Sequence, residues 1–279
     1  MTTPLQPERP LSAEDETLAR HREELRKRFP LPTPKPRKPR KGLIAGALLV
    51  LVSAGLVWLD PAYRTEHYSS AIGERRVLDL TDGSRLVLDS NTRVEVSWHL
   101  RTRQVKLASG QVLFNVRRTL IRPFLVDAGT ARIKVLGTQF NVFREPYAVH
   151  VALMRGSVHV ESTMDPTQHM QLIPGQQAEV RHGQLRLADN ADIPRILAWR
   201  DRRLMFSHTP LSEAIAQIQR YRQAPIRLDD ERLASLEVSG VFNTNKVEEL
   251  LDLLPRILPV ALKRDADGTV HLTRKVAKK

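Results

Sequence analysis

The pattern of apolar and polar positions changes along the chain. Residues 42–59, GLIAGALLVLVSAGLVWL, form an unbroken apolar run. Between about 70 and 188, apolar and polar residues alternate in short segments, which is the period of half-buried strands. Between about 200 and 275, the alternating segments are interrupted by two stretches with the i, i+3, i+4, i+7 spacing of amphipathic helices. The pattern predicts an apolar helix, a mainly β domain and a small α+β module, in this order.

The apolar run 42–59 is long enough to predict one transmembrane helix. At about 1.5 Å per residue it reaches roughly 27 Å, close to the thickness of a hydrocarbon core. It lacks a stripe of 3.6-residue period and it follows a 41-residue tail, so a buried core helix and a cleaved signal peptide both fit less well. The basic segment 35–41, KPRKPRK, directly precedes it. The positive-inside rule then places the N-terminus in the cytoplasm and residues 60–279 outside it.

The tail 1–41 reads as a short helix followed by a linker. A capping-box pattern lies at 12–15, and Leu18 and Leu25 share one face up to about Phe29. Repeated prolines between 30 and 39 predict an extended, basic linker. Such a short helix is marginal alone in water. A solvated helix and a helix that docks on a cytoplasmic partner fit the tail equally well.

Residues 70–188 repeat a unit of a glycine, one or two polar residues and an alternating strand. The units start at Gly83, Gly110, Gly137, Gly156, Gly175 and Gly183. The pattern at 82–84, Asp-Gly-Ser between two such strands, is a good hairpin signal. About a dozen short strands with one apolar face each predict an antiparallel sandwich or stacked hairpins.

The same segment offers little chemistry. It has no nucleophile elbow, dinucleotide or phosphate-binding loop, or zinc-protease motif, and the chain has no cysteine. His150 and His159 alternate with valines on strands and have no third ligand nearby, so we expect no metal site there. No cofactor is expected, and no enzyme that turns over freely.

The net charge of +13 does not point to nucleic acid. Residues 1–41 carry 11 Lys and Arg against 6 Asp and Glu, and the rest of the excess is spread over more than two hundred residues. Aromatic residues make up 5%, so stacking platforms are scarce. We therefore expect no direct contact with nucleic acid.

The module at 200–275 is predicted to contain two helices between short strands. The first helix follows a strand at 203–206 and starts after Thr209-Pro210, and the second is predicted to be capped by Asn245 with Glu248 and to end at Pro255. Their expected buried faces are Leu211, Ala214, Ile215 and Ile218 in the first helix and Val247, Leu250, Leu251 and Leu254 in the second.

The strand predicted at 236–242 is the candidate binding edge of this module. Open strand edges invite strand addition by a partner, although a stability domain without partners is the alternative. The side chains that would contact the partner are Leu236, Val238, Val241 and Phe242.

Two parts of the sequence resemble a known family. RVLDLTDGSRLVLDSNTRVEV, RQVKLASGQVLFNV, RPFLVDAGTARIKVLGTQFNVF and LMRGSVHV, within 70–188, closely resemble the FecR-like regulators, inner-membrane anti-sigma factors named for the iron-citrate sensor. The segment from LMFSHTPLSEAIAQIQRYRQAPIRL to RDADGTVHL resembles the short N-terminal module of secretins and TonB-dependent receptors, which FecR-like proteins also carry.

The resemblance implies a signalling role. It implies that the signalling domain of a TonB-dependent outer-membrane receptor, loaded with a ferric siderophore or haem, contacts the C-terminal part in the periplasm. An extracytoplasmic-function sigma factor is then controlled by the cytoplasmic tail. This tail departs from the family, in which it usually has some eighty residues and tryptophans. The alternative is a membrane-tethered periplasmic binding or assembly module that regulates no sigma factor.

The resemblance also singles out the bond between Gly137 and Thr138. Some FecR-like proteins cleave themselves at a Gly-Thr bond in the matching segment. The Thr138 hydroxyl would attack the Gly137 carbonyl and form an ester that water hydrolyses, a step that needs strain or a nearby base. Gly129-Thr130 and Gly268-Thr269 share the dipeptide but not its flanking strands. A bulge glycine before a β-branched residue is the alternative.

Overall fold

The structure is a computed structural model that describes residues 13–30, 41–188 and 191–275. The chain divides into two units, 1–53 and 54–279, which are described separately. The expected helix in the tail is present as α1 (Ala13–Arg28), and Leu18 and Leu25 are exposed on it. The capping box predicted at 12–15 and the linker predicted at 31–40 lie outside the residues whose side chains or backbone are described.

The apolar run forms helix α2 (Lys41–Leu59). In the described part of the chain, however, no helix is both long and apolar enough to cross a membrane. Within α2, side chains are described without interruption only at 48–55, whereas a span needs about 20 consecutive apolar residues. The fold class with a transmembrane helix at 42–59 is therefore wrong, and the described fold consists of a mainly β domain and an α+β module.

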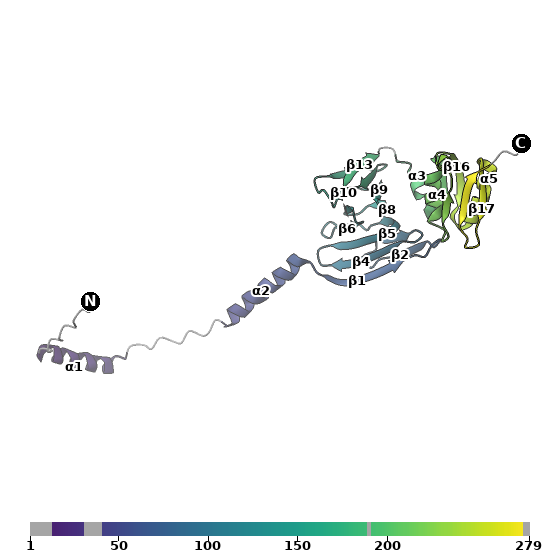
Figure 1. Ribbon diagram of the computed structural model, residues 1–279. Coiled ribbons are helices and arrows are strands. Elements are labelled where there is room, and N and C mark those ends of the chain that lie inside the picture. Colours follow the sequence, from purple (N-terminus) through teal and green to yellow (C-terminus); the bar gives the residue numbers. More distant parts are fainter. Residues whose placement is uncertain (1–12, 31–40, 189–190, 276–279) are drawn as a thin grey trace, which may run out of the picture. The chain divides into compact units, whose positions relative to one another are not determined.

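Residues 62–188, the β domain, form one hydrogen-bonded sheet of 13 strands (Figure 1). The strands are β1 (Ala62–Ser69), β2 (Arg76–Asp79), β3 (Arg85–Leu88), β4 (Arg93–His99), β5 (Arg103–Asn115), β6 (Phe124–Asp127), β7 (Ala131–Val135), β8 (Gln139–Arg144), β9 (Ala148–Arg155), β10 (Val158–Ser162), β11 (His169–Leu172), β12 (Gln177–Arg181) and β13 (Gln184–Ala188). Their order is β11-β10-β7-β6-β5-β8-β9-β12-β13, with β4 and β1 attached to one part of β5 and β3 and β2 to the other.

The 13-residue strand β5 joins the two halves of this sheet. Its first part pairs with β4 and β6, and its second part pairs with β3 and β8. Gly110 lies where the partners change, at φ 91°, and a Cβ there would lie 2.3 Å from the Thr92 hydroxyl. Only glycine allows this conformation and this close approach. The glycine predicted to start a strand therefore lies inside one.

The sheet folds so that one face of each half packs into a shared core. The Phe114 ring stacks on Phe140 at 4.9 Å within one half and meets Phe124 of the other half edge-on at 6.1 Å. All three rings are fully buried. The predicted purely antiparallel sandwich needs correction, because β5 and β6 run parallel and β5 makes the two layers one continuous sheet.

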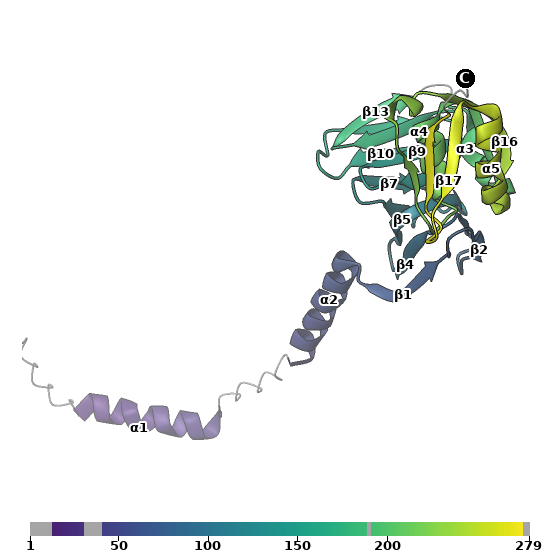
Figure 2. The ribbon, with the colours of Figure 1, turned by 45° about the vertical axis from the view of Figure 1, so that its right-hand side comes forward.

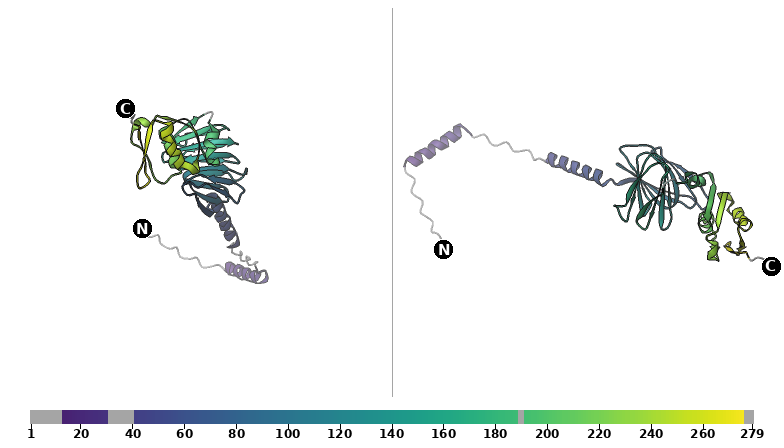
Figure 3. Two further views of the ribbon diagram at one scale, coloured as in Figure 1. Left: turned by 90° about the vertical axis from the view of Figure 1, so that its right-hand side faces the viewer. Right: turned by 90° about the horizontal axis from the view of Figure 1, so that it is seen from above.

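The C-terminal module, residues 203–274, contains two small sheets and two helices (Figure 2). It consists of β14 (Arg203–Pro210), α4 (Leu211–Gln219), β15 (Ile226–Leu228), η2 (Glu231–Leu233), β16 (Glu237–Asn243), η3 (Thr244–Lys246), α5 (Val247–Ile257), β17 (Val260–Arg264) and β18 (Val270–Arg274). The sheets have the orders β14-β16 and β15-β18-β17. Helix α3 (Ile193–Leu197) and η1 (Ala198–Asp201) precede the module. Figure 3 shows the β domain and the module in two further views.

The predicted buried faces of both helices are confirmed, since all eight apolar residues named for them are buried. The expected cap of the second helix is wrong. α5 begins at Val247, and Asn245 lies in η3, where its N–H is bound by the Asn243 side chain. Pro255 lies inside α5 rather than at its end. Glu248 is therefore free to reach two arginines instead of capping its own helix.

Candidate functional site

Strand β16 offers an edge, as predicted. It pairs with β14, and no other described strand pairs with it. The four side chains named for partner binding do not share one role. Val238 is buried in the core of the module, Phe242 packs 5.8 Å from the Phe206 ring, and Leu236 is half-buried. Val241, 57% exposed, is the member of the four that presents an apolar side chain to solvent.

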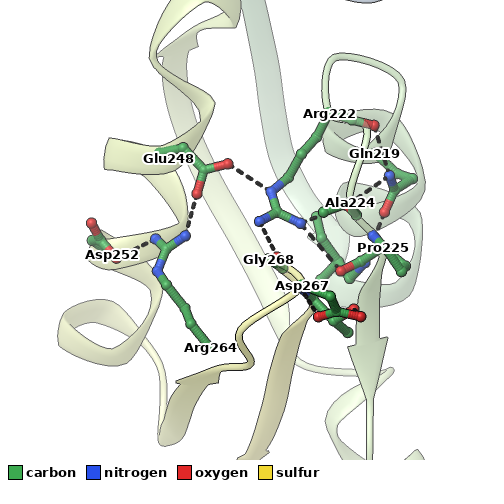
Figure 4. Close-up of polar contacts among 11 residues, drawn as sticks. Gln219, Arg222, Ala224, Pro225, Glu248, Asp252, Arg264, Asp267 and Gly268 are labelled. Atoms are coloured by element: carbon green, nitrogen blue, oxygen red, sulfur yellow. Dashed lines mark hydrogen bonds and ion pairs between the residues drawn. The ribbon is translucent and has the colours of Figure 1, made fainter.

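Arg222 fastens the parts of the module together (Figure 4). Its side chain is 8% exposed and follows α4. The guanidinium donates to the carbonyls of Ala224, Pro225 and Gly268 and to Glu248 Oε1 at 2.6 Å. A buried guanidinium is tolerated only when its donors are satisfied, and here they bind the carbonyls of two turns and the first turn of α5.

Arg264 of β17 completes this network on the other side of Glu248. It contacts Glu248 Oε2 and donates to Asp252 Oδ1 at 2.7 Å, so it joins β17 to α5 (Figure 4). Burial raises the pKa of Glu248, but the hydrogen bonds from Arg264 and Arg222 outweigh this and hold the pKa below its ordinary 4.5. The network thus joins the turn after α4, the turn before β18, helix α5 and strand β17.

A buried polar cluster, here called the latch, joins the module to the β domain. It consists of Asp89, which follows β3, and of Arg220 and Tyr221, which follow α4. The Asp89 carboxylate is 2% exposed and pairs with the Arg220 guanidinium. The Tyr221 hydroxyl donates to both carboxylate oxygens, at 3.0 and 2.9 Å. Ser90 Oγ also donates to the Arg220 carbonyl, so backbone and side chain are both held.

The latch is strongly desolvated, and its pKa shifts follow from this. Burial raises the pKa of Asp89 above its ordinary 3.8, although the nearby Arg220 charge acts in the opposite direction. Burial beside the Asp89 carboxylate also raises the pKa of Tyr221. Arg220 lies 4.3 Å from the centre of the Phe143 ring of β8, a cation–π contact with the β domain. Separation of the module would rehydrate all of these groups together.

A cleft of about 480 Å³ opens beside the latch. β5, β8, β9 and β12 line one side, and α3, η1, β14 and α4 line the other. His150 contributes an imidazole 3.6 Å from Glu145, and hydrogen bonding to His150 holds the pKa of Glu145 below its ordinary value. The indole N–H of Trp199, which also borders the cleft, is buried without a hydrogen-bond partner.

Gly137 and Thr138 lie between β7 and β8, away from the latch residues. A Cβ on Gly137 would lie 2.5 Å from the Cα of Arg118, so close packing of backbone requires glycine here. Thr138 is 3% exposed, and its hydroxyl donates to the Ser157 carbonyl at 2.9 Å. The structure therefore orients the hydroxyl on a carbonyl acceptor.

Metal chemistry finds no support in the described residues. No three His, Cys, Asp or Glu side chains come together there in a way that could hold a metal ion. His150 and His159 occupy different places: His150 borders the cleft, and the His159 ring lies 5.6 Å from His169.

The latch was not predicted from the sequence. Asp89 and Arg220 are 131 positions apart, in two separate segments of the sequence. The one local signal is a carboxylate directly after a strand whose apolar residues, Leu86 and Leu88, are fully buried. A pattern read along one segment cannot say what such a carboxylate meets.

Comparison with known proteins places both folded parts in one family. The family model described as FecR protein matches residues 66–159, and the model described as FecR, C-terminal, matches 203–272. Two crystal structures of a putative anti-sigma factor from Parabacteroides distasonis, at 2.50 and 1.65 Å resolution, are similar to the chain with a TM-score of 0.65 and 25% identity. The matches cover 76% and 75% of this chain and 99% of that chain. No curated protein matches the sequence.

Proposed function

We propose that this chain, which belongs to the FecR protein family, regulates a sigma factor. The observation that carries the proposal is the succession of the two matched segments in one chain. It is supported by the likeness to a structure described as a putative anti-sigma factor, which extends over 99% of that chain.

The finer proposal concerns the signal. The module is the receiving part, and the signalling domain of a TonB-dependent outer-membrane receptor for iron-siderophore or haem uptake is its partner. Strand β16 supports this, because an edge strand can accept a partner strand through its backbone while an exposed Val241 adds an apolar contact. In a pull-down with the receptor's signalling domain, Val241→Glu weakens binding, whereas Leu253→Glu on exposed α5 is the control.

The cytoplasmic partner is proposed to be an extracytoplasmic-function sigma factor that binds α1. Leu18 is 65% exposed, Leu25 52% and Phe29 72%. Three exposed large apolar side chains on or next to one charged helix are typical of a docking stripe. In a bacterial two-hybrid test of residues 1–41 against the sigma factor, Leu18→Ser with Leu25→Ser abolishes the signal, and Glu24→Ser preserves it. Absence of any contact, together with an unchanged regulon after deletion of the tail, overturns the proposal.

The location of the parts follows from these partners. A sigma factor is met in the cytoplasm and an outer-membrane receptor in the periplasm, so we propose that the tail is cytoplasmic and that the β domain and module are periplasmic, at the inner membrane. Alkaline phosphatase fused after residue 275 is then active, and the same enzyme fused after residue 30 is inactive. The reverse result refutes this arrangement.

Self-cleavage at Gly137-Thr138 is a separate proposal. The Thr138 oxygen adds to the Gly137 carbonyl carbon, the C–N bond breaks, and the amide nitrogen takes up the hydroxyl proton. Water then hydrolyses the ester to the Gly137 carboxylate and restores the hydroxyl. The close packing against Arg118 supports the proposal, because it confines the bond to one conformation.

A doubly tagged chain tests the cleavage. β7 pairs with β6 and β10, and β8 pairs with β5 and β9, so both fragments would stay in one sheet and must be separated under denaturing conditions. Two fragments are expected for the wild type, none for Thr138→Ala, and two for the control Thr130→Ala. An intact wild-type band refutes the proposal.

A further inference from the structure

Three separate segments meet at one end of the β domain. Asp60, at the start of the domain, accepts hydrogen bonds from the Arg101 N–H at 2.8 Å and from the Thr102 hydroxyl at 2.9 Å. Arg122 contacts the His99 carbonyl, which brings the loop before β6 to the same place. The end therefore consists of the entry to β1, the β4–β5 turn and the loop 116–123.

Hydrogen bonds fix the backbone of the loop 116–123. Arg103, 2% exposed, donates to the Arg122 carbonyl at 3.1 Å, to the Arg117 carbonyl at 3.2 Å and to Asp82 at 2.6 Å. The Thr119 N–H donates to the Leu136 carbonyl at 2.7 Å. A buried guanidinium that binds two carbonyls of one loop fixes the backbone of that loop, although the other terminal nitrogen of Arg103 has no hydrogen-bond partner among the described residues. The loop's outward side chains are therefore presented by a supported backbone.

These side chains are large and apolar. Ile121 is 85% exposed, Leu120 70% and Leu100, in the neighbouring turn, 58%. Two further apolar residues, Trp58, 78% exposed, and Leu59, 69% exposed, directly precede Asp60, which binds the neighbouring turn. Large exposed apolar side chains gathered at one end of a domain usually mark a contact with another apolar phase or partner.

Basic side chains outnumber acidic ones around these residues. Residues 96–126 contain no Asp or Glu, but they contain Arg101, Arg103, Lys106, Arg117, Arg118 and Arg122. The acids that reach this end from other segments, Asp60 and Asp82, already accept the hydrogen bonds described above. Arg101 and Arg118 are exposed beside the apolar tips. Exposed arginines next to protruding leucine and isoleucine match an anionic lipid surface, with guanidinium groups on phosphates and apolar tips below them.

We propose that this end of the β domain, residues 100–101 and 117–122, rests on an anionic phospholipid surface with Leu120 and Ile121 inserted among the headgroups. The charge complementarity and the exposed Trp58 and Leu59, which directly precede Asp60, favour lipid as the occupant. The contact is independent of whether the chain regulates a sigma factor.

The absence of cysteine allows a site-specific test. Ile121→Cys in the full chain is labelled with the environment-sensitive dye NBD, and vesicles of phosphatidylglycerol and phosphatidylcholine are added. The label is expected to shift to the blue and to be shielded from aqueous quenchers. Label at Ile257→Cys, 52% exposed on α5, is the matched control and is expected to stay in water.

The charge requirement is tested with the same label. Pure phosphatidylcholine vesicles give little shift, and Arg101→Glu with Arg118→Glu raises the lipid concentration for half-maximal shift about tenfold or more. Circular dichroism verifies that the variant is folded. An unchanged spectrum at position 121 with anionic vesicles, an equal shift at position 257, or equal binding to neutral vesicles overturns the proposal.

Discussion

Replacement of Arg220 by methionine tests how much the ion pair of the latch contributes to stability. Methionine keeps an unbranched apolar side chain next to Phe143 but removes the charge that faces Asp89. The Asp89 carboxylate is 2% exposed, and in the variant it would keep only the Tyr221 hydroxyl as a side-chain partner from the module. A buried carboxylate that loses its cation must be protonated, be rehydrated or remain as an uncompensated charge.

The burial of Asp89 determines how much unfolding free energy the variant should lose. Breaking one side of a buried ion pair typically costs about 3–5 kcal/mol. Protonation of a carboxyl group of ordinary pKa 3.8 at pH 7 costs about 4 kcal/mol, and less here because burial already raises the pKa of Asp89. Arg220→Met is therefore expected to reduce the unfolding free energy by about 3–4 kcal/mol at pH 7, or to open the latch if opening costs less.

Both outcomes are measurable on the full chain. Urea unfolding gives the free energy, and a dye pair at Met164→Cys in the β domain and Ile257→Cys in the module reports separation, since both sites are exposed. Asp89→Asn added to Arg220→Met recovers at least about 2 kcal/mol, because no unpaired charge remains. A double-mutant cycle gives the coupling.

The pH dependence provides a second check. The Arg220 charge lowers the pKa of Asp89 against the effect of burial, so its removal raises that pKa further, and the deficit of Arg220→Met shrinks as pH falls from 7 toward 3.8. Arg232→Met removes an exposed arginine paired with Asp230 and costs less than about 1 kcal/mol. A loss below about 1 kcal/mol for Arg220→Met, with unchanged dye distance and no pH trend, refutes the reasoning.

Three further predictions concern the network of Arg222 and Glu248 and the glycine inside β5. Arg222→Met removes the side-chain donor to the Gly268 carbonyl and one of the two arginine partners of Glu248, and we expect a loss of about 1–3 kcal/mol in urea unfolding, against less than about 1 for Arg232→Met. Because the folded-state pKa of Glu248 is lowered, its contribution to the unfolding free energy is present above pH 4.5 and is lost as pH falls below this value. Glu248→Gln should therefore remove part of the acid sensitivity of thermal melts between pH 3 and 6. A pH profile equal to that of the wild type would contradict this. Gly110→Ala costs more than about 3 kcal/mol through backbone strain and a clash, whereas Gly175→Ala, at φ 92° with nothing within 4 Å of the added Cβ, costs about 1–2; equal losses would contradict the clash.

The elements predicted best are those whose stability is local. The buried faces of α4 and α5 follow from a 3.6-residue period, because a helix must turn one stripe of apolar residues toward the core. The cap at Asn245 failed because Glu248 gains more from Arg222 and Arg264 than from a backbone N–H. Pro255 is tolerated inside α5, close to its end at Ile257. Tertiary ion pairs override local signals at these positions.

The features missed depend on distant residues. The repeat of glycine and strand predicted separate strands around Gly110, but β5 continues through it, because its partners on both sides pair with it in turn. The latch joins residues 131 positions apart, so no periodicity could reveal it. The apolar run 42–59 predicted a membrane span from composition alone, which the described helices do not provide. The strand of the binding edge was predicted, but the burial of the Val238 side chain in the core of the module was not.

Strand β5 runs from the loop 116–123 to the cleft beside the latch. Its first residue, Arg103, holds the loop 116–123, and Gln111 near its other end borders the cleft beside the latch. A close-packed sheet transmits strain but bends little, so an open latch should leave the far end of β5 in place. In the Arg220→Met variant, the label at Ile121→Cys should therefore respond to anionic vesicles as before, while the dye pair reports a displaced module. A label response that changes together with the latch would show that β5 couples the two ends.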